Sequence, residues 1–268
     1  MVLFFSATGN TEYIAKQIAV CLNEQSVDLL PLIREHDYSD IHSETPFVIC
    51  SPVYVCEMPG FLAEYLKKVK LTGSRDVYFV FTSGGYAGIS GPLAGSIVRK
   101  KGMNYRGCAE LVMPQNYIAT DLYDELEDSE IERRIAESSG MVGQIAETIR
   151  RGDDLKARHK WLLEYAAILP VNPVWQRVMQ PVKYFYVTGT CIGCGLCAER
   201  CPLKRIWMMP LKTSGKLSAY PKWTGHSCAH CMSCIQNCPV HAIEYGDITQ
   251  GKKRYRFKDY QYAAQESE

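Results

Sequence analysis

The chain has no long hydrophobic run. No stretch of its 268 residues approaches the ~18 consecutive apolar residues of a membrane-spanning helix. Its most apolar segment, WLLEYAAILPVNPVW, is interrupted by Glu164. The sequence also opens without a basic segment that leads into an apolar one, the pattern of a secretory signal. These absences exclude a transmembrane helix and lead us to expect a cytoplasmic protein.

Two phosphate-binding signatures are also missing. The chain contains neither GxxxxGK followed by Ser or Thr nor GxGxxG, which argues against a P-loop and a dinucleotide-binding domain.

Net charge is nearly absent, with 30 Lys and Arg against 29 Asp and Glu. The charge is divided unevenly, however: residues 1–150 hold 13 basic and 20 acidic side chains, and residues 188–268 hold 11 and 6. Such asymmetry indicates separate modules.

Residues 1–150 alternate between short apolar runs and segments with helical spacing. Nearly continuous apolar strands separated by helices are typical of a parallel sheet covered on both faces. We therefore predict an α/β fold, a doubly wound sheet of five parallel strands with its ligand beyond the carboxyl ends of the strands. The expected strands are Val2–Ser6, Val27–Leu32, Phe47–Ser51, Val77–Thr82 and Cys108–Met113, and the expected helices are Asn10–Asn23, Pro59–Val69, Gly91–Lys101 and Glu130–Arg150.

The rest of the chain divides into two further segments. Residues 151–187 are rich in apolar and aromatic side chains, and Pro170, Pro173 and Pro181 limit the length of any helix. We expect a packed helical connector there. Residues 188–268 are rich in cysteine, glycine and proline, which indicates a second, smaller domain.

The turn between the first expected strand and helix reads SATGNT. Its glycine permits a tight turn, and the residues around it supply three hydroxyl groups and one amide. The new helix adds free N–H groups and the positive end of its dipole. The turn is consistent with a neutral phosphate cradle, although an ordinary capped turn explains the hexamer equally well. The candidate cradle residues are Ser6, Thr8, Gly9, Asn10 and Thr11.

Three later loops also follow expected strands and therefore meet at the same edge of the sheet. They read SPVYVCEMPG, TSGGYAGISG and MPQNY, and each contains an aromatic residue. Together with SATGNT this constellation resembles the flavodoxin family over roughly residues 1–150. The resemblance implies that FMN binds with its phosphate on the SATGNT turn and its ring between the next two loops. The implied ring residues are Pro52, Val53 and Tyr54 on one side and Ser83, Gly84, Gly85, Tyr86 and Gly88 on the other.

Eight of the twelve cysteines fall in two arrays of the form C-x2-C-x2-C-x3-C-P, CIGCGLCAERCP and CAHCMSCIQNCP. Thiolates are the ligands of iron–sulfur clusters, and these short spacings let one loop surround a cluster. Structural zinc and disulfides are the alternatives. Neither explains three closely spaced cysteines and a fourth before proline, twice.

The segment of residues 188–268 resembles the bacterial ferredoxin family with two 4Fe-4S clusters. The resemblance implies a small α+β domain. In that arrangement the fourth cysteine of each array binds the other cluster. One cluster is then held by Cys191, Cys194, Cys197 and Cys238, and the other by Cys228, Cys231, Cys234 and Cys201. The arrays also form an internal repeat, since CPLKRI matches CPVHAI, and we expect Ile206 and Ile243 to shield equivalent faces.

The other cysteines and the histidines have plainer explanations. We expect Cys21, Cys50 and Cys108 to pack in the core, whereas Cys56 lies in an implied ring loop. We expect His226, His230 and His241 to be rim residues and not ligands, since eight cysteines already complete two clusters. The basic run KKRYRFK suggests nucleic acid, but it is also explained by the negative charge of two clusters.

Taken together, the two halves resemble flavodoxin–ferredoxin fusion proteins. The resemblance implies a protein that passes low-potential electrons between a bound FMN, two 4Fe-4S clusters and partner redox enzymes, typical of an anaerobe. An FMN-dependent reductase of a small organic substrate, fed by its own clusters, is the alternative, and whether the chain is an enzyme stays open. A nucleic-acid sensor is a third possibility, but the sequence offers no recognition helix for that function. The redox partners and the oligomeric state do not follow from the sequence.

Overall fold

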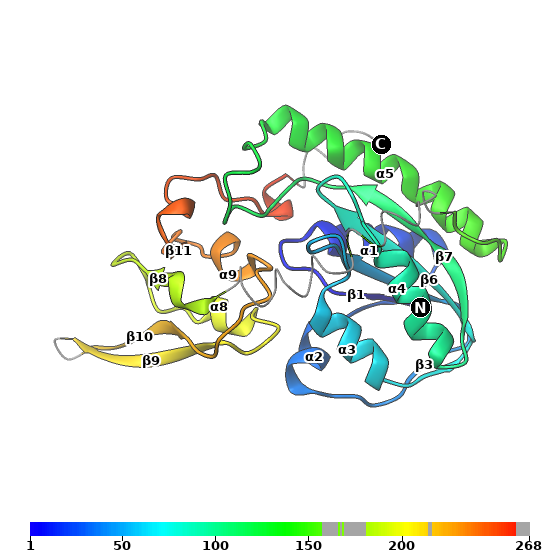
Figure 1. The fold of residues 1–268 in the computed structure, drawn as a ribbon, viewed down its shortest axis with the longest axis horizontal. Coiled ribbons are helices and arrows are strands. Elements are labelled where there is room, and N and C mark those ends of the chain that lie inside the picture. The colour runs from blue at the N-terminus through cyan, green and yellow to red at the C-terminus, as the bar shows by residue number, and fades with distance from the viewer. Residues whose placement is uncertain (157–165, 167, 169–180, 214–215, 261–268) are drawn as a thin grey trace.

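The computed structural model describes residues 1–156, 166, 168, 181–213 and 216–260 (Figure 1). The N-terminal part contains β1 (Val2–Phe4), α1 (Asn10–Leu22), β2 (Ser26–Asp28), α2 (Leu30–Glu35), β3 (Ile41–Ser43), β4 (Phe47–Pro52), α3 (Gly60–Lys68), β5 (Leu71–Gly73), β6 (Asp76–Ser83), α4 (Ser90–Lys100), β7 (Asn104–Val112) and α5 (Asp128–Arg150). The C-terminal part contains β8 (Phe185–Val187), α8 (Leu196–Glu199), β9 (Ile206–Thr213), β10 (Lys216–Trp223), α9 (Ser233–Gln236) and β11 (Ile243–Tyr245).

The predicted five-stranded parallel sheet is confirmed. Its strand order is β2-β1-β4-β6-β7, and every neighbouring pair is parallel. Numbered along the sheet strands alone, this is the order 2-1-3-4-5 of the flavodoxin-like doubly wound fold. Strand order reverses beside β1, so the loops after β1 and β4 open a crevice at the carboxyl ends of the strands.

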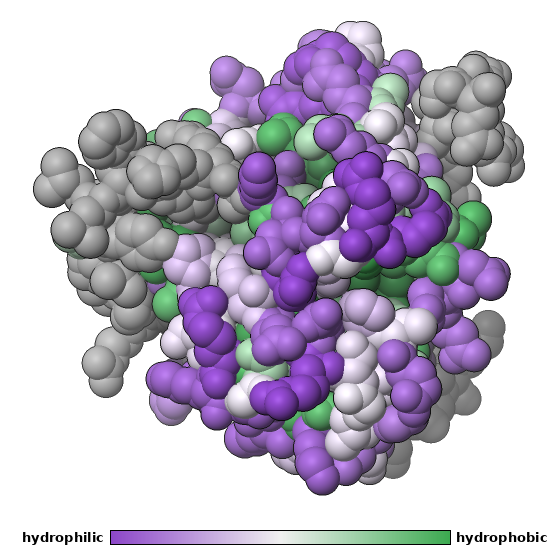
Figure 2. Space-filling view, turned by 90° about the vertical axis from the view of Figure 1, so that its right-hand side faces the viewer, coloured by the Kyte–Doolittle hydropathy of each residue, from purple (hydrophilic) through white to green (hydrophobic). Residues whose placement is uncertain are grey.

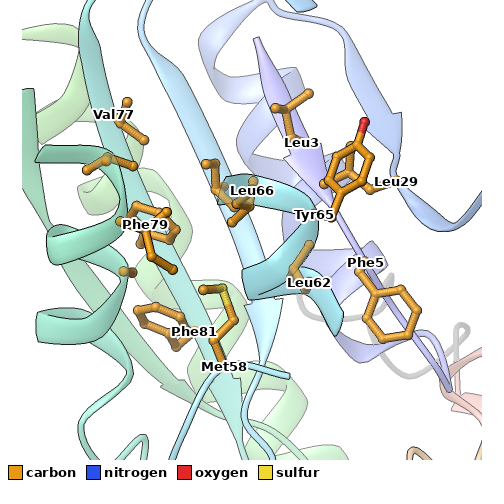
Figure 3. Close-up of a cluster of buried hydrophobic side chains, with 14 of the residues drawn as sticks. Leu3, Phe5, Leu29, Met58, Leu62, Tyr65, Leu66, Val77, Phe79 and Phe81 are labelled. Carbon is orange, nitrogen blue, oxygen red and sulfur yellow. The ribbon is translucent and has the colours of Figure 1, made fainter. Parts of the chain in front are cut away.

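One face of the sheet packs against α2, α3 and α4. Successive side chains of a strand point to opposite faces, so alternate residues reach this one. They include Leu3 of β1, Phe5 directly after β1, and Phe79 and Phe81 of β6. Leu62 and other residues of α3 fill the space above them (Figure 3). All five of these side chains are at most 1% exposed, so this face forms a continuous core.

The intervening strand residues face the opposite side, where α1 and α5 pack (Figure 1). Phe4, Val48 and Val80 meet Ile14 of α1 and Ile135 of α5 in this second core. The two layers of helices explain why the central strands β1, β4 and β6 are largely apolar.

The second strand differs from the prediction of Val27–Leu32. β2 ends at Asp28, whose carboxylate oxygen accepts a hydrogen bond from the N–H of Leu30 at 2.9 Å, and α2 follows at once. Pro31 lies in the first turn of α2, where its missing N–H removes no helical bond. The apolar run VDLLPLI is therefore a strand followed by a helix, and its second half was wrongly predicted as strand.

The remaining cysteines are placed partly as predicted. Cys50 and Cys108 are buried in the two cores, and burial raises the pKa of the Cys50 thiol. Cys21 is exposed, so the prediction that it packs in the core is wrong. It lies in the last turn of α1, on the same side as Ile14, but no residue of the helix after Ala19 is buried, so the apolar spacing does not bury Cys21.

The cysteine-rich unit is built around a short antiparallel pair and two one-turn helices. β8 pairs with β11, and α8 and α9 contact each other. An antiparallel hairpin, β9 and β10, lies between the two cysteine arrays and was not predicted. β8 ends at Val187, within the segment predicted as a connector. The predicted connector of residues 151–187 otherwise lies mostly outside the described residues.

Charged contacts join this unit to the N-terminal domain. Arg34 of α2 donates through Nη1 to the carbonyl oxygens of Ala198 at 2.8 Å and Cys201 at 2.5 Å. Lys204 pairs with Glu35 at 2.8 Å. The two halves thus meet at this boundary through one ion pair and two hydrogen bonds from a charged donor.

We predict that Arg34→Met lowers the free energy of unfolding by about 1–3 kcal/mol, because two carbonyl groups lose a charged donor. Denaturant titration followed by circular dichroism measures the change. Lys67→Met, which removes an exposed pair with Glu64, is the control and should change stability by less than about 0.5 kcal/mol. Equal effects of the two substitutions would contradict a special role of Arg34.

The C-terminal segment returns to the N-terminal domain. Lys252 and Lys253, in the basic run KKRYRFK, pair with Asp121 at 2.6 Å and Asp128 at 2.7 Å. The N–H of Phe257 donates to the carbonyl oxygen of Thr8 at 2.9 Å. This basic run therefore forms contacts within the chain.

No helix in the part of the chain that the structure describes is long and apolar enough to cross a membrane. On the face of the molecule shown in Figure 2, hydrophilic residues predominate and hydrophobic residues form separate patches. This face lies on the side of the N-terminal domain that is turned away from the cysteine-rich unit (Figure 1).

Candidate functional site

A cavity of about 810 Å³ lies at the carboxyl ends of the sheet strands. The loops after β1, β4, β6 and β7 all contribute to it, as the doubly wound fold requires. It brings together all the predicted flavin-site residues except Gly9 and Gly88. The members are Ser6, Thr8, Asn10, Thr11, Pro52, Val53, Tyr54, Ser83, Gly84, Gly85 and Tyr86.

The loop after β1 presents the N-terminus of α1 to this cavity. Gly9 caps the helix with φ 106°, a left-handed conformation that favours glycine, and its N–H donates to Ser6 Oγ at 3.1 Å. Within the described residues, the N–H groups of Thr8, Asn10 and Thr11 donate to no protein acceptor. Free N–H donors at a helix N-terminus favour an anion there, and they need no lysine to do so.

The side chains of this loop are fixed by the other strand ends. Thr8 Oγ1 accepts a hydrogen bond from Asn116 Nδ2 at 2.6 Å, and Thr11 Oγ1 bonds with Thr82 Oγ1 at 2.8 Å. Asn10 Nδ2 donates to the carbonyl oxygen of Pro114 at 3.0 Å. The cradle is therefore preorganised by contacts with β6 and the loop after β7.

The loop after β4 forms a tight turn at the cavity. Tyr54 and Glu57 exchange backbone hydrogen bonds of 2.8 and 3.2 Å across Val55 and Cys56, which have φ values of 50° and 64°. Positive φ is unfavourable for both residues, above all for β-branched Val55. Gly88 lies directly behind this turn: a Cβ there would be 2.0 Å from the carbonyl oxygen of Cys56. Gly88 thus allows the two predicted ring loops to touch.

Several cavity residues were not predicted. Thr82, Tyr123, Asp124 and Arg134 come from the N-terminal domain, and Arg134 Nη1 donates to the carbonyl oxygen of Gly84 at 3.0 Å. Thr82 could have been found, because it ends an apolar strand at the ligand edge. Cys56, Asn116 and Tyr117, which lie in loops considered in the sequence, also line the cavity.

Two further lining residues, Ala229 and His230, come from the second cysteine array. His230 is 4% exposed, and its Nδ1 bonds with the hydroxyl of Tyr117 at 3.1 Å. Burial lowers the pKa of His230 to about 4, so the imidazole is neutral at pH 7. Its Nε2 has no hydrogen-bond partner among the described residues. His230 was predicted to be a rim residue, and the structure instead buries it beside the cavity.

Cysteines of the two arrays lie close to one another. Burial, together with smaller effects of the neighbouring Cys194, Cys238 and Cys191, raises the pKa of Cys197 to about 11. Burial also raises the pKa of Cys231, followed by the effects of Cys228 and Cys201. Cys238 thus lies with the first array and Cys201 with the second. The exchange of fourth ligands that the ferredoxin resemblance implies stays a prediction.

The two arrays also have the same backbone hydrogen bonds to sulfur. The second residue after the first cysteine donates its N–H to that sulfur, Gly193 to Cys191 at 3.5 Å and His230 to Cys228 at 3.3 Å. The fourth residue after the last cysteine does likewise, and these bonds run from Arg205 to Cys201 and from Ala242 to Cys238, both at 3.2 Å. Ile206 and Ile243 are both buried. The predicted internal repeat is therefore present in three dimensions.

The geometry of the sulfurs bears on the zinc alternative. Zinc–sulfur bonds of about 2.3 Å would draw four thiolates tightly around one ion. No group of three His, Cys, Asp or Glu side chains in the described ranges is arranged to hold a single ion. Backbone N–H groups donate to sulfur in both arrays, and hydrogen bonds to the sulfurs are a feature of iron–sulfur clusters.

Comparison with known proteins supports this view of the C-terminal unit. Residues 184–204 match the 4Fe-4S binding domain family. Over 58 residues, 20% of this chain, the sequence is 36% identical to an uncharacterized polyferredoxin-like protein of Methanocaldococcus jannaschii. The matched region spans only 34% of that relative's length.

Solved structures resemble the N-terminal part. A two-electron reduced flavodoxin of Megasphaera elsdenii is 15% identical, with 55% of this chain and 98% of that chain covered and a TM-score of 0.33. A putative flavoprotein of Bacteroides eggerthii is 14% identical, with 56% and 96% covered and a TM-score of 0.36. The assignment of the fold rests on the strand order described above.

The chain therefore joins a flavodoxin-like domain to a ferredoxin-like unit with a 4Fe-4S binding motif. This is the organisation of a flavodoxin–ferredoxin fusion, and it supports a role in redox electron transfer.

Proposed function

We propose that this protein binds FMN in the 810 Å³ cavity and two 4Fe-4S clusters at its eight array cysteines. It passes low-potential electrons between them and to or from partner redox enzymes. The observation that carries this proposal is the shared wall: Ala229 and His230 of the second cysteine array line the same cavity as the SATGNT turn. Cofactors held at these two places lie next to each other.

Different cavity residues bind the phosphate and the ring of FMN. The free N–H groups of Thr8, Asn10 and Thr11 suit the phosphate, as does the dipole of α1. Tyr54 and Tyr86, on two separate loops, suit the faces or edges of the ring. When bound, FMN supplies one- and two-electron redox chemistry, and each cluster supplies one-electron chemistry.

A second function is favoured by one specific observation. The cavity continues past the predicted flavin residues to Tyr123, Asp124 and Arg134, where a small organic molecule has polar partners. In that case the protein is an FMN-dependent reductase that its own clusters supply with electrons. Steady-state turnover of a small acceptor would favour the reductase, whereas stoichiometric exchange with redox proteins would favour the carrier.

The experiment that tests the main proposal is anaerobic purification with quantification of iron, sulfide and flavin. We expect about eight iron atoms, from two four-iron clusters, and one FMN per chain. Iron without flavin would leave a ferredoxin alone and would contradict the shared-wall argument. Zinc in place of iron would contradict the cluster assignment.

We predict that Thr8→Ala raises the dissociation constant of FMN about tenfold, because the cavity loses a hydroxyl and Asn116 loses the acceptor that positions it. Titration of the flavin-free protein, followed by flavin fluorescence, measures the constant. Iron content should not change. Thr148→Ala, remote on α5, is the control, since its hydroxyl bonds only within that helix. Unchanged affinity in Thr8→Ala would contradict the cradle assignment.

A further inference from the structure

The two cysteine arrays are equivalent in sequence and in local hydrogen bonding, but their surroundings differ. We propose that the set of Cys201, Cys228, Cys231 and Cys234 exchanges electrons with the flavin, and that the set of Cys191, Cys194, Cys197 and Cys238 faces the external redox partners. This order rests on the proposed function, and it is argued from contacts that distinguish the two arrays.

The second array is bonded to the loops that form the cavity. Ser233 Oγ and Asn237 Nδ2 both donate to the carbonyl oxygen of Ala7, each at 3.0 Å. Gln236 Nε2 donates to the carbonyl oxygen of Asn116 at 2.7 Å. The helix between these residues, α9, therefore rests on the SATGNT turn and on the loop after β7. These bonds hold the second set at a constant separation from the cavity.

The cysteines of the second array also reach the predicted ring loop. Cys231 is 8% exposed and belongs to the same hydrophobic core as Phe5 and Ala7. Tyr54, which lines the cavity, is close enough to Cys231 and Cys228 that their charges, after burial, raise its pKa. Tyr54 and Ala229 thus stand between the second set and the space proposed for the flavin ring.

The first array has the opposite environment. Ile192 is 62% exposed and Cys194 is exposed, and no residue from 191 to 201 lines the cavity in the described part of the chain. Trp207 on the neighbouring hairpin is 63% exposed, and Val240, directly after the Cys238–Pro239 pair, is 36% exposed. This set is therefore the one that an external protein can approach closely.

The resulting sequence of transfers balances one electron at a time. A reduced external protein loses one electron to the first set, which passes it to the second set, and the second set passes it to the flavin. Each donor is oxidised as its acceptor is reduced. Two such transfers reduce the flavin fully, with protons taken from water, and the reverse order delivers electrons outward.

The repeat supplies a matched pair of variants, because Ala229 and Ile192 occupy the same position after the first cysteine of each array. Ala229→Ile places the first array's side chain between the second set and the cavity. We expect it to raise the FMN dissociation constant at least about tenfold through overpacking, with iron unchanged. Ile192→Ala should leave FMN affinity unchanged. Hydrogen–deuterium exchange on the cluster-loaded protein provides a second readout: FMN should slow exchange at residues 228–231 but not at 191–194.

Electron transfer is tested with Cys231→Ala and Cys194→Ala, which are also equivalent in the repeat. After anaerobic photochemical injection of electrons, Cys231→Ala should lose reduction of the flavin by the remaining cluster, and Cys194→Ala should retain it. Equal loss in both variants, or exchange protection by FMN at residues 191–194, would overturn the proposed order alone. If the unmodified protein bound no FMN, the proposed function would also be overturned.

Discussion

Alanine at both Cys201 and Cys228 is expected to leave about four iron atoms per chain, whereas alanine at both Cys201 and Cys191 is expected to leave almost none. The first pair removes two ligands from one cluster and spares the other. The second pair removes one ligand from each cluster. The reason is the predicted exchange of fourth ligands, in which Cys201 binds the same cluster as the second array and Cys238 the same cluster as the first. Iron and sulfide analysis, with visible absorption of the anaerobic protein, measures the result.

The opposite outcome is equally definite. If each array enclosed its own cluster, the pair of Cys201 and Cys191 would leave about four iron atoms and the pair of Cys201 and Cys228 almost none. Cys21→Ala is the matched control, because Cys21 is an exposed cysteine outside both arrays. It should keep the full iron content. The comparison depends on which two residues are combined, so a general loss of stability cannot imitate it.

The architecture of the N-terminal domain was predictable because its signals are local. Each apolar run, such as FVICS in β4, records two buried faces of the sheet, and each following turn marks the ligand edge. The second strand shows the limit of this reasoning. The run VDLLPLI is apolar apart from Asp28, and only the hydrogen bond from the N–H of Leu30 to Asp28 and the position of Pro31 separate strand from helix.

The candidate site was predictable only on one side. The SATGNT turn and the loops after β4 and β6 each hold their candidate binding residues within a short segment, and the spacing of the cysteines is itself a pattern of metal ligands. The wall formed by Ala229 and His230 has no such signal. It depends on contacts between residues more than 200 positions apart, such as Ser233 with Ala7, which neither periodicity nor composition encodes. The same holds for the return of the C-terminal segment.

That C-terminal segment packs against the SATGNT turn. Phe257 is 4% exposed and stacks on Tyr13 of α1, with ring centroids 4.1 Å apart. Its Cβ lies only 2.7 Å from the position of a Cβ at Gly9, so any larger residue at Gly9 would collide with it. Tyr255 adds a hydrogen bond from its hydroxyl to Asn10 Oδ1 at 2.5 Å. The SATGNT turn is therefore held between the sheet and residues near the other end of the chain.

We accordingly predict that Phe257→Ala lowers the free energy of unfolding by about 3–5 kcal/mol, the usual cost of removing a buried phenyl group from a core. Thermal and denaturant unfolding measure this change. Affinity for FMN should fall as well, because the turn loses its brace, while iron content should not. Trp207→Ala is the control: Trp207 is 63% exposed, and its loss should change stability by less than about 0.5 kcal/mol. A loss of stability in Phe257→Ala with unchanged FMN affinity would show that the segment stabilises the fold without shaping the SATGNT turn.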